Sequence, residues 1–494
     1  YELKDKSDSK VIHNSFLIVV NDEDAVYPIT IDPLSSTAAW TAEINQANAN
    51  FGWSVATAGD VNDDGYSDVI VGAPYYDNGQ TDEGGVFVYH GSINGLSLSA
   101  NWTMESNQSS ALFGWSVATA GDVNGDGYSD VIIGSPTYDS VQTDEGRAYV
   151  YYGSVSGLQA VHAWKYETNQ AGENFGYSLA CAGDVNNDGY SDVVIGSPFY
   201  DNGQTNEGRV YVFKGSTGGL PVTADWTYEM NTLDTYLGFS VATAGDINGD
   251  NFSDITIGAP RYDIGLPDYG RVYIFHSNGN TFPATPTTTR TGLQTGENFG
   301  YSVSTAGDVN GDGYSDIMIG APLYTNGQVD EGRCYCYLGS SSGIGAAAVW
   351  TQESNEISGQ FGISVSTAGD LNADGFADVI LGGNYLDNGQ TDEGRAFVYL
   401  GYSGGLSSGS AIIYESNQSN SRFGISVATA GDINGDGFSD VIVGSHMFDS
   451  PSANEGRAFV FLGSAIGMSS AFVWSSESNQ SNSDFGFSVS SAGD

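Results

Sequence analysis

Acidic and amide side chains recur along this chain in clusters that could hold a hard metal ion. Residues 122–130 read Asp-Val-Asn-Gly-Asp-Gly-Tyr-Ser-Asp, which places side-chain oxygens at positions 1, 3, 5 and 9 of a loop. With the main-chain carbonyl of position 7, this is the ligand order of an EF-hand calcium loop, and Gly127 at position 6 permits the sharp turn. Oxygen donors at this density favour Ca²⁺ over zinc and other metals of softer sites.

The pattern occurs seven times, so up to seven bound Ca²⁺ ions are expected. In each copy the predicted ligands are three aspartates, one asparagine and the main-chain carbonyl of an aromatic residue. These ligands are Asp60, Asn62, Asp64, Tyr66 and Asp68; Asp122, Asn124, Asp126, Tyr128 and Asp130; Asp184, Asn186, Asp188, Tyr190 and Asp192; Asp246, Asn248, Asp250, Phe252 and Asp254; Asp308, Asn310, Asp312, Tyr314 and Asp316; Asp370, Asn372, Asp374, Phe376 and Asp378; and Asp432, Asn434, Asp436, Phe438 and Asp440.

The loops differ from an EF-hand at position 12, where the bidentate glutamate is missing and a buried strand is expected instead, at Ile133 in the second copy. Water or a second carboxylate oxygen would have to complete the shell. In the fourth copy Asn251 replaces the glycine of position 6, which predicts a weaker site, because asparagine tolerates a left-handed backbone less well than glycine. A turn rich in aspartate and asparagine that binds no metal is the alternative interpretation.

The acidic loops belong to a sequence repeat of constant length. A Phe-Gly pair returns every 62 residues and an aspartate follows nine residues after each start. A constant repeat length means that each unit meets its neighbours in the same way, so the acidic loops are expected at equivalent points on one face. The repeats start at Phe51, Phe113, Phe175, Leu237, Phe299, Phe361, Phe423 and Phe485.

Each repeat is expected to supply four short strands. In the second repeat these are 113–120, which alternates large and small residues, the apolar run 131–136, then 146–152, and the more polar 162–167. Small residues on the first strand and rising polarity toward the fourth describe one propeller blade. The predicted fold is therefore an all-β, seven-bladed β-propeller of four-stranded antiparallel blades. A β-solenoid is the alternative, although its coils are usually much shorter.

These residues resemble a known family of repeats. The Phe-Gly pairs, the Asp-rich loops and the Gly-Ala-Pro triplets at 72–74, 258–260 and 320–322 look like FG-GAP repeats. Such repeats form the propeller of integrin α-subunits and occur in many secreted microbial proteins, and the resemblance extends over about residues 40–494. It implies a seven-bladed propeller with Ca²⁺ between strands one and two, and often a role in adhesion. Neither an Arg-Gly-Asp motif nor the leg domains of an integrin occur in this sequence.

The repeat pattern also suggests the domain organisation. We expect residues 1–36 to form an N-terminal arm or the end of an upstream β-rich domain, 37–478 to form the propeller, and 479–494 to begin an eighth repeat. Segments that resemble a fourth, outer strand occur at both ends of the repeats, at Trp40 and at Trp474. A closed ring of seven blades needs only one of these two strands. We read the chain as a part of a longer or processed polypeptide.

Composition restricts the partners. With 60 acidic and 14 basic residues the formal charge is −46, which argues against nucleic acid, because phosphate contacts need lysine and arginine. Seven Ca²⁺ ions would bring this charge to −32. No apolar run approaches the roughly 18 residues needed to cross a membrane, so membrane insertion is not expected. The three cysteines read as small buried residues.

Arginine and tryptophan each recur at a position of their own in the repeat, and each series has two interpretations. An arginine ring could bind an anionic ligand, or each arginine could pair with a nearby acid; a tryptophan series could stack on sugars, or pack within the rim strands. The arginines are Arg147, Arg209, Arg271, Arg333, Arg395 and Arg457, with Gly85 in the first repeat, and the tryptophans are Trp40, Trp102, Trp164, Trp226, Trp350 and Trp474.

The expected function is binding, not catalysis. No His-Glu-x-x-His or Gly-x-Ser-x-Gly motif and no nucleophile-base pair can be recognised. We expect an extracellular calcium-binding propeller, secreted or on the cell surface, that binds a protein or glycan ligand as an adhesion module. A structural spacer and a hydrolase with its active site at the propeller mouth are the alternatives. The fourth repeat departs most from the pattern, notably at Leu237, Tyr269 and 281–290, so a specific ligand site is expected to involve it.

Overall fold

The computed structural model describes residues 42, 44, 46, 48–92, 95–263, 265, 267–409, 411–449, 453–465, 467–469, 472–477 and 484–491. The chain divides into two compact units, Tyr1–Ser35 and Ser36–Asp494. The expected N-terminal arm and the segment around Trp40 lie outside the described residues. Strands are the regular elements of the described part, and no helix in it is long and apolar enough to cross a membrane.

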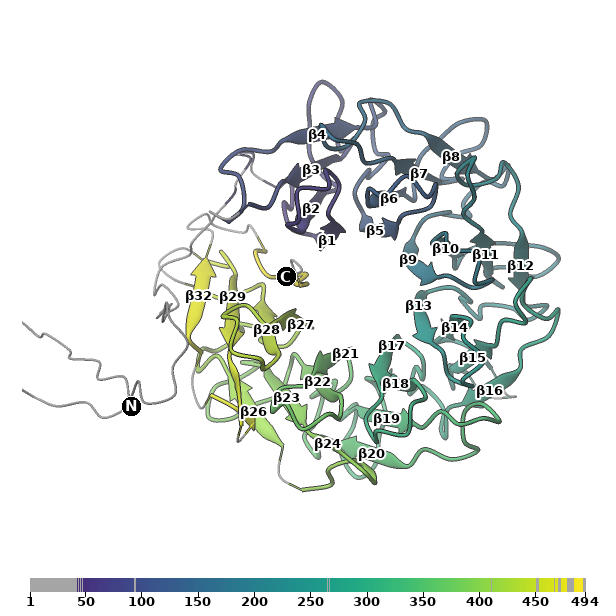
Figure 1. The fold of residues 1–494 in the computed structure, drawn as a ribbon. Helices are drawn as coiled ribbons and strands as arrows, with labels where there is room; N and C mark the ends of the chain where they lie inside the picture. Colours follow the sequence, from purple (N-terminus) through teal and green to yellow (C-terminus); the bar gives the residue numbers. More distant parts are fainter. Residues whose placement is uncertain are drawn as a thin grey trace, which may run out of the picture. The chain divides into compact units, whose positions relative to one another are not determined.

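The second unit is a seven-bladed β-propeller, as predicted. Each repeat forms one antiparallel sheet, with the strands hydrogen-bonded in chain order. Figure 1 shows the first strands innermost around a central axis and the fourth strands at the rim. The blades consist of β1 (Ser54–Gly59), β2 (Asp68–Ala73), β3 (Gly85–Tyr89) and β4 (Trp102–Glu105); β5 (Ser116–Gly121), β6 (Asp130–Ser135), β7 (Arg147–Tyr151) and β8 (Trp164–Glu167); β9 (Ser178–Gly183), β10 (Asp192–Ser197), β11 (Arg209–Phe213) and β12 (Trp226–Glu229); β13 (Ser240–Gly245), β14 (Asp254–Ala259), β15 (Arg271–Phe275) and β16 (Thr288–Thr291); β17 (Ser302–Gly307), β18 (Asp316–Ala321), β19 (Arg333–Tyr337) and β20 (Trp350–Glu353); β21 (Ser364–Gly369), β22 (Asp378–Gly383), β23 (Arg395–Tyr399) and β26 (Ile412–Glu415); and β27 (Ser426–Gly431), β28 (Asp440–Ser445), β29 (Arg457–Phe461) and β32 (Trp474–Glu477).

Two further pairs of very short strands lie before the rim strands of blades six and seven. They are β24 (Gly401–Tyr402) with β25 (Gly405–Leu406), and β30 (Gly463–Ser464) with β31 (Gly467–Met468).

The hydrophobic core lies between neighbouring blades. Between blades two and three, Val150 of the third strand and Phe175 at the start of the next repeat have no exposed surface and pack in one cluster. The first strands approach closely because their residues are small: Ser116 Oγ donates to the carbonyl of Gly176 in the next blade, 2.8 Å away. The second strands are apolar on both faces because each is covered on both faces.

The tryptophans of the rim strands pack within the fold and also connect blades. Trp164 is buried against blade three, and its Nε1–H donates to the carbonyl of Pro221, 2.7 Å away. Trp102, Trp226 and Trp350 make the equivalent bond to Gln159, Pro283 and Ser407. Of the two roles considered for this series, the described members have the packing role.

The beginning of the eighth repeat lies between the last blade and the first. Ser426 Oγ of blade seven donates to the carbonyl of Gly486, as in the regular blade contacts. On the other side, the ring of Phe487 stacks on Trp53, with centroids 4.3 Å apart, and Val55 N–H donates to Ser488 Oγ at 3.2 Å. Residues 484–491 therefore form the described part of the seam between blade seven and blade one.

Blade four is more regular than its sequence indicates. The segment 281–290 departs from the repeat pattern, yet β16 begins within it and pairs Thr288 with Ile274, in the register that pairs Trp226 with Val212 in blade three. Backbone pairing at the rim does not require the tryptophan. The expectation of a ligand site in this blade stays a prediction.

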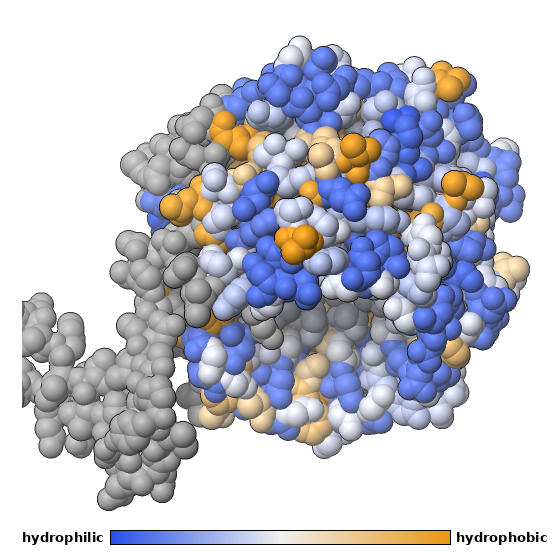
Figure 2. Space-filling view, turned by 45° about the horizontal axis from the view of Figure 1, so that its top comes forward, coloured by the Kyte–Doolittle hydropathy of each residue, from blue (hydrophilic) through white to orange (hydrophobic). Residues whose placement is uncertain are grey.

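The surface reflects the acidic composition. Figure 2 shows hydrophilic residues over much of the visible described face, with hydrophobic residues scattered among them. Cys334 and Cys336 are buried and free, whereas Cys181 is half-buried and also free.

Candidate metal centre

The seven acidic loops connect the first and second strands of the blades and share one backbone path. In blade two, Asp122 accepts hydrogen bonds from the main-chain N–H of Asp126 at 3.2 Å and of Gly127 at 2.9 Å. Asp126 in turn accepts from the N–H of Tyr128 at 3.1 Å and from the amide of Asn124 at 3.0 Å. These bonds wind the loop around the side chains of positions 1 and 5.

The backbone at position 6 is left-handed in each loop. Gly127 has a φ of 92°, and Asn251 takes the corresponding conformation with a φ of 67°. The N–H of Asn251 donates to Asp246 at 2.7 Å, as the glycine does elsewhere. The fourth loop thus keeps the common path despite its substitution, at a higher conformational cost than glycine would have.

The aspartate at position 9 has a structural role that the sequence analysis missed. Asp130 has no exposed surface, and its two carboxylate oxygens accept the main-chain N–H of Val123 and of Gly153, each at 3.0 Å. It joins the loop to the turn after the third strand. Burial raises the pKa of Asp130 to about 7, with smaller contributions from Asp126 and Asp122, while the two backbone hydrogen bonds lower it. Its position directly before the apolar residues 131–134 is the sequence signal for this burial.

The loops are joined to one another by their main chains. The N–H of Ser129 in blade two donates to the carbonyl of Asp60 in blade one, 2.9 Å away. The same bond joins Ser191 to Asp122, Ser253 to Asp184, Ser315 to Asp246, Ala377 to Asp308 and Ser439 to Asp370. The predicted metal loops therefore form a continuous series along one face of the propeller.

The recurring arginines pair within the fold. Arg147 lies over the ring of Tyr138, 3.7 Å from its centre, and forms an ion pair with Glu167 on the neighbouring strand. Arg209, Arg395 and Arg457 also pair with glutamates, whereas Arg333 and Arg271 donate to threonine hydroxyls. Pairing with a nearby acid, one of the two interpretations for this series, therefore holds for four of the six arginines, and the other two donate to hydroxyl groups instead.

Comparison with known proteins assigns the family. The FG-GAP repeat profile matches residues 51–89, 113–151, 175–213, 237–275, 299–335, 361–399 and 423–461, which together are more than half of the chain. Each match runs from the start of a repeat through most or all of its third strand. The chain belongs to the FG-GAP repeat family.

The relatives of this chain include integrin α-subunits. The chain is 33% identical over 326 residues to integrin alpha-PS2 of Drosophila melanogaster, a match that covers 58% of this chain and 22% of the relative. It is 31% identical over 293 residues to integrin alpha-V of Gallus gallus (56% and 27%), and 31% identical over 280 residues to integrin alpha-8 of the same species (51% and 25%). The matches span only about a quarter of the length of these relatives.

The donor set of the FG-GAP loops fits a hard cation. Each loop offers oxygen atoms alone, and none of the ion pairs among the described residues involves a loop aspartate, so no lysine or arginine offsets the loop charge there. In the described residues, however, no three acidic, histidine or cysteine side chains already converge as a metal site. The side chains of positions 1 and 5 accept hydrogen bonds from N–H groups of the loop, and position 5 is exposed.

Proposed function

We propose that this FG-GAP propeller is a calcium-stabilised, extracellular binding module of a longer adhesion protein. The observation that carries the proposal is the series of seven oxygen-only loops, joined main chain to main chain along one face. Asp122, Asn124, Asp126, Asp130 and the carbonyl of Tyr128 would hold the ion in blade two, and their equivalents would hold it elsewhere. The ion would offset the repulsion among three carboxylates within one loop.

Calcium has a structural part in this proposal. The loops connect the two inner strands of each blade, and successive loops are hydrogen-bonded to one another. A ligand that binds the folded loop and not the unfolded chain stabilises the fold by mass action, about 2.7 kcal/mol per site at 100 times its dissociation constant. Extracellular calcium modules have dissociation constants of roughly 10⁻⁴ to 10⁻³ M.

Equilibrium dialysis against Ca²⁺, after treatment with a chelator, tests the metal part directly. We expect saturable uptake of several ions per chain, approaching seven. Asp126→Ala removes the exposed position-5 carboxylate of one loop and is expected to lower the uptake by one ion. Uptake no greater than that of an acidic protein without such loops would contradict the proposal.

The binding part rests on the family resemblance and on the similarity to integrin α-subunits. We propose a protein or glycan as the ligand, because repeated blades carry variable loops on a rigid scaffold. A panel of matrix proteins and glycans, probed with and without Ca²⁺, is the test. Binding that requires Ca²⁺ supports an adhesion module, whereas no binding in the panel favours a structural spacer. No catalytic role is proposed.

A further inference from the structure

Blade one lacks an arginine that every other blade has at the start of its third strand. In blade three, Arg209 lies directly opposite Glu229 in the register of β11 and β12. In blade one the same register places Gly85 opposite Glu105. Blade one thus retains the carboxylate of the pair and has no side chain in the place of the cation.

Blade three shows how the protein itself binds this guanidinium group. Arg209 donates to Tyr200 Oη at 2.8 Å and to Thr227 Oγ1 at 3.0 Å, and its Nη1 lies 3.5 Å from the Glu229 carboxylate. Its guanidinium carbon lies 4.9 Å from the ring centre of Tyr200 and 5.1 Å from that of Tyr211. Two aromatic rings, two hydroxyls and one carboxylate therefore make the site.

Blade five repeats the tyrosine and threonine contacts independently, with Glu353 opposite Arg333 in the strand register but not in an ion pair with it. Arg333 donates to Tyr324 Oη at 2.7 Å and to Thr351 Oγ1 at 2.8 Å. Its guanidinium carbon lies 4.9 Å and 5.1 Å from the ring centres of Tyr324 and Tyr335. The same side chains at the same repeat positions thus hold an arginine twice in similar geometry.

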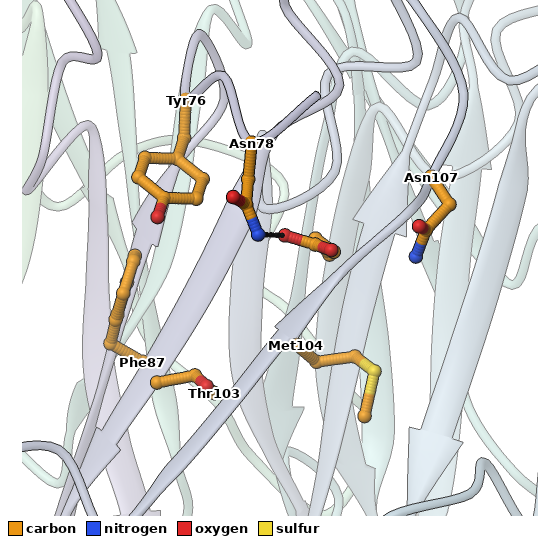
Figure 3. Close-up of a pocket in the computed structure, with 7 residues that line it drawn as sticks. Tyr76, Asn78, Phe87, Thr103, Met104 and Asn107 are labelled. Atoms are coloured by element: carbon orange, nitrogen blue, oxygen red, sulfur yellow. Dashed lines mark hydrogen bonds between the residues drawn. The ribbon is translucent and has the colours of Figure 1, made fainter. Parts of the chain in front are cut away.

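Blade one has this set of side chains around a pocket. Tyr76, Phe87, Thr103 and Glu105 occupy the positions of the two aromatic rings, the threonine and the glutamate in blades three and five. They line a pocket of about 330 Å³, together with Asn78, Met104 and Asn107 (Figure 3). The only change in type among the first four is Phe87 for tyrosine.

The carboxylate of the pocket is held in place, and no described side chain pairs a cation with it. Asn78 Nδ2 donates to Glu105 Oε2 at 2.7 Å, as Asn202 does to Glu229 at 2.6 Å, so the carboxylate is held as it is in blade three. None of the ion pairs among the described residues involves Glu105. Phe87 is buried, and the ring of Tyr76 meets it edge to face at 5.5 Å.

The pocket can be reached from solvent. Asn78, Thr103 and Asn107 are exposed, and they lie on its lining. A side chain from another molecule can therefore enter where the protein's own arginine enters from the strand in the other blades.

We propose that this pocket binds the guanidinium group of an arginine side chain presented by a partner polypeptide. A guanidinium is planar, stacks on aromatic faces and donates in a fork to a carboxylate, and the pocket offers each of these contacts. A lysine ammonium is a more strongly hydrated point charge and matches the aromatic walls less well. The site does not involve the acidic loops, and its occupancy does not depend on the proposed calcium role.

Saturation-transfer difference NMR with Nα-acetyl-L-arginine methylamide tests the proposal on the whole chain. For one side chain in a partly exposed pocket we expect a dissociation constant of roughly 1 mM. The corresponding lysine amide is expected to bind several-fold more weakly. Equal binding of the two would overturn the assignment to a guanidinium, and no transfer to the arginine amide would overturn the site.

Two reciprocal variants connect the signal to this pocket. Gly85→Arg is expected to fill it from within and abolish the transfer, without lowering the melting temperature. Gly85 does not have a left-handed φ. Its added β-carbon would lie 2.8 Å from the Tyr76 ring and 3.3 Å from the Phe87 ring, so the Tyr76 side chain must shift, but no main-chain atom is in the way. Arg209→Gly should open the equivalent pocket in blade three and approximately double the transfer. Unchanged binding by a folded Gly85→Arg variant would contradict the proposal.

Glu105→Gln separates the charge from the shape of the pocket. The amide keeps the size of the side chain but removes the negative charge, so binding of the arginine amide should weaken at least several-fold. Undiminished binding would show that the carboxylate takes no part and would also contradict the proposal.

Discussion

The main chains of Gly146 and Phe175 lie in direct contact, joined by a parallel β-bridge between blades two and three. The N–H of Phe175 donates to the carbonyl of Glu145 at 3.1 Å. A β-carbon on Gly146 would overlap the main-chain nitrogen and oxygen of Phe175. An equivalent bridge joins each later blade to the start of the next repeat, as far as Gly456 and Phe485. The first residue of each Phe-Gly pair from Phe175 onward therefore marks a main-chain contact between neighbouring blades.

Replacing this glycine should therefore be costly. We expect Gly146→Ala to lower the free energy of unfolding by more than Gly203→Ala does. Gly203 also has a left-handed φ, of 98°, but no atom lies within 4 Å of its added β-carbon. That control reports the backbone strain alone, about 1–2 kcal/mol. Urea unfolding of both variants is the measurement, and equal losses would show that the blade contact adapts freely.

Two aspartates of one loop should respond differently to removal of calcium. Asp130→Asn puts an amide N–H against a buried main-chain N–H, so it should destabilise by about 1–3 kcal/mol even in chelator. Asp126→Asn alters an exposed residue that accepts two hydrogen bonds within the loop, and it should destabilise less in chelator than Asp130→Asn does. In Ca²⁺ it should lose part of the gain in melting temperature.

Differential scanning calorimetry in chelator and in excess Ca²⁺ measures both effects. If the two variants behaved alike in chelator, the structural role assigned to Asp130 would be wrong. If Asp126→Asn kept the full calcium response, its loop would not hold an ion.

Glu173 should make stability depend on pH. Burial raises its pKa from 4.5 to about 7, although the nearby hydroxyls of Thr168 and Ser197 and the hydrogen bond from Tyr211 lower it. The folded protein keeps a proton that the unfolded chain releases in this range, so the contribution is present below about pH 4.5 and is lost as pH rises through about 7.

The neutral variant Glu173→Gln should escape this loss. Relative to the wild type, its free energy of unfolding should rise between pH 4.5 and 8, by at most about 3 kcal/mol at 1.36 kcal/mol per pKa unit. Urea unfolding across that range is the measurement. Parallel pH profiles for variant and wild type would refute the prediction. Glu297, whose pKa burial also raises to about 7, offers an independent test with Glu297→Gln.

The stability of the acidic loop of blade four should increase, or stay the same, when Asn251 is replaced by glycine. Asn251 holds a φ of 67°, which costs glycine nothing. We expect Asn251→Gly to be neutral or stabilising and Asn251→Ala to destabilise by about 1 kcal/mol. Thermal melting in chelator compares the two, and a stabilising alanine would contradict the left-handed conformation of this residue.

The sequence determined the fold to a large extent because one unit repeats without insertions. The apolar run 131–136 corresponds to β6 at Asp130–Ser135, and the other expected strands of that repeat lie where β5, β7 and β8 form. The segment 281–290 lacks the side-chain pattern of the other rim strands, so the pattern alone does not indicate β16. Its pairing depends instead on the main chain of β15, which any suitable neighbour can extend.

The candidate site was less predictable. Ligand order identifies the loops, but it could not show that Asp130 serves two backbone N–H groups, because Gly153 is distant in sequence. Nor could it show whether the carboxylates converge. Gly85 was recognisable as the exception among the arginines, yet the pocket depends on Tyr76 and Thr103, which the fold brings beside it.

The seam at residues 484–491 has a mechanical consequence. All other neighbouring blades are covalently continuous, whereas blade seven and blade one are joined in the described residues by contacts such as Phe487 on Trp53 and Val55 with Ser488. Tension applied at residue 491 therefore loads these few non-covalent contacts before it reaches the sheets. In a protein pulled from that end, peeling of this segment would be the first event, and the strength of the ring would be set there.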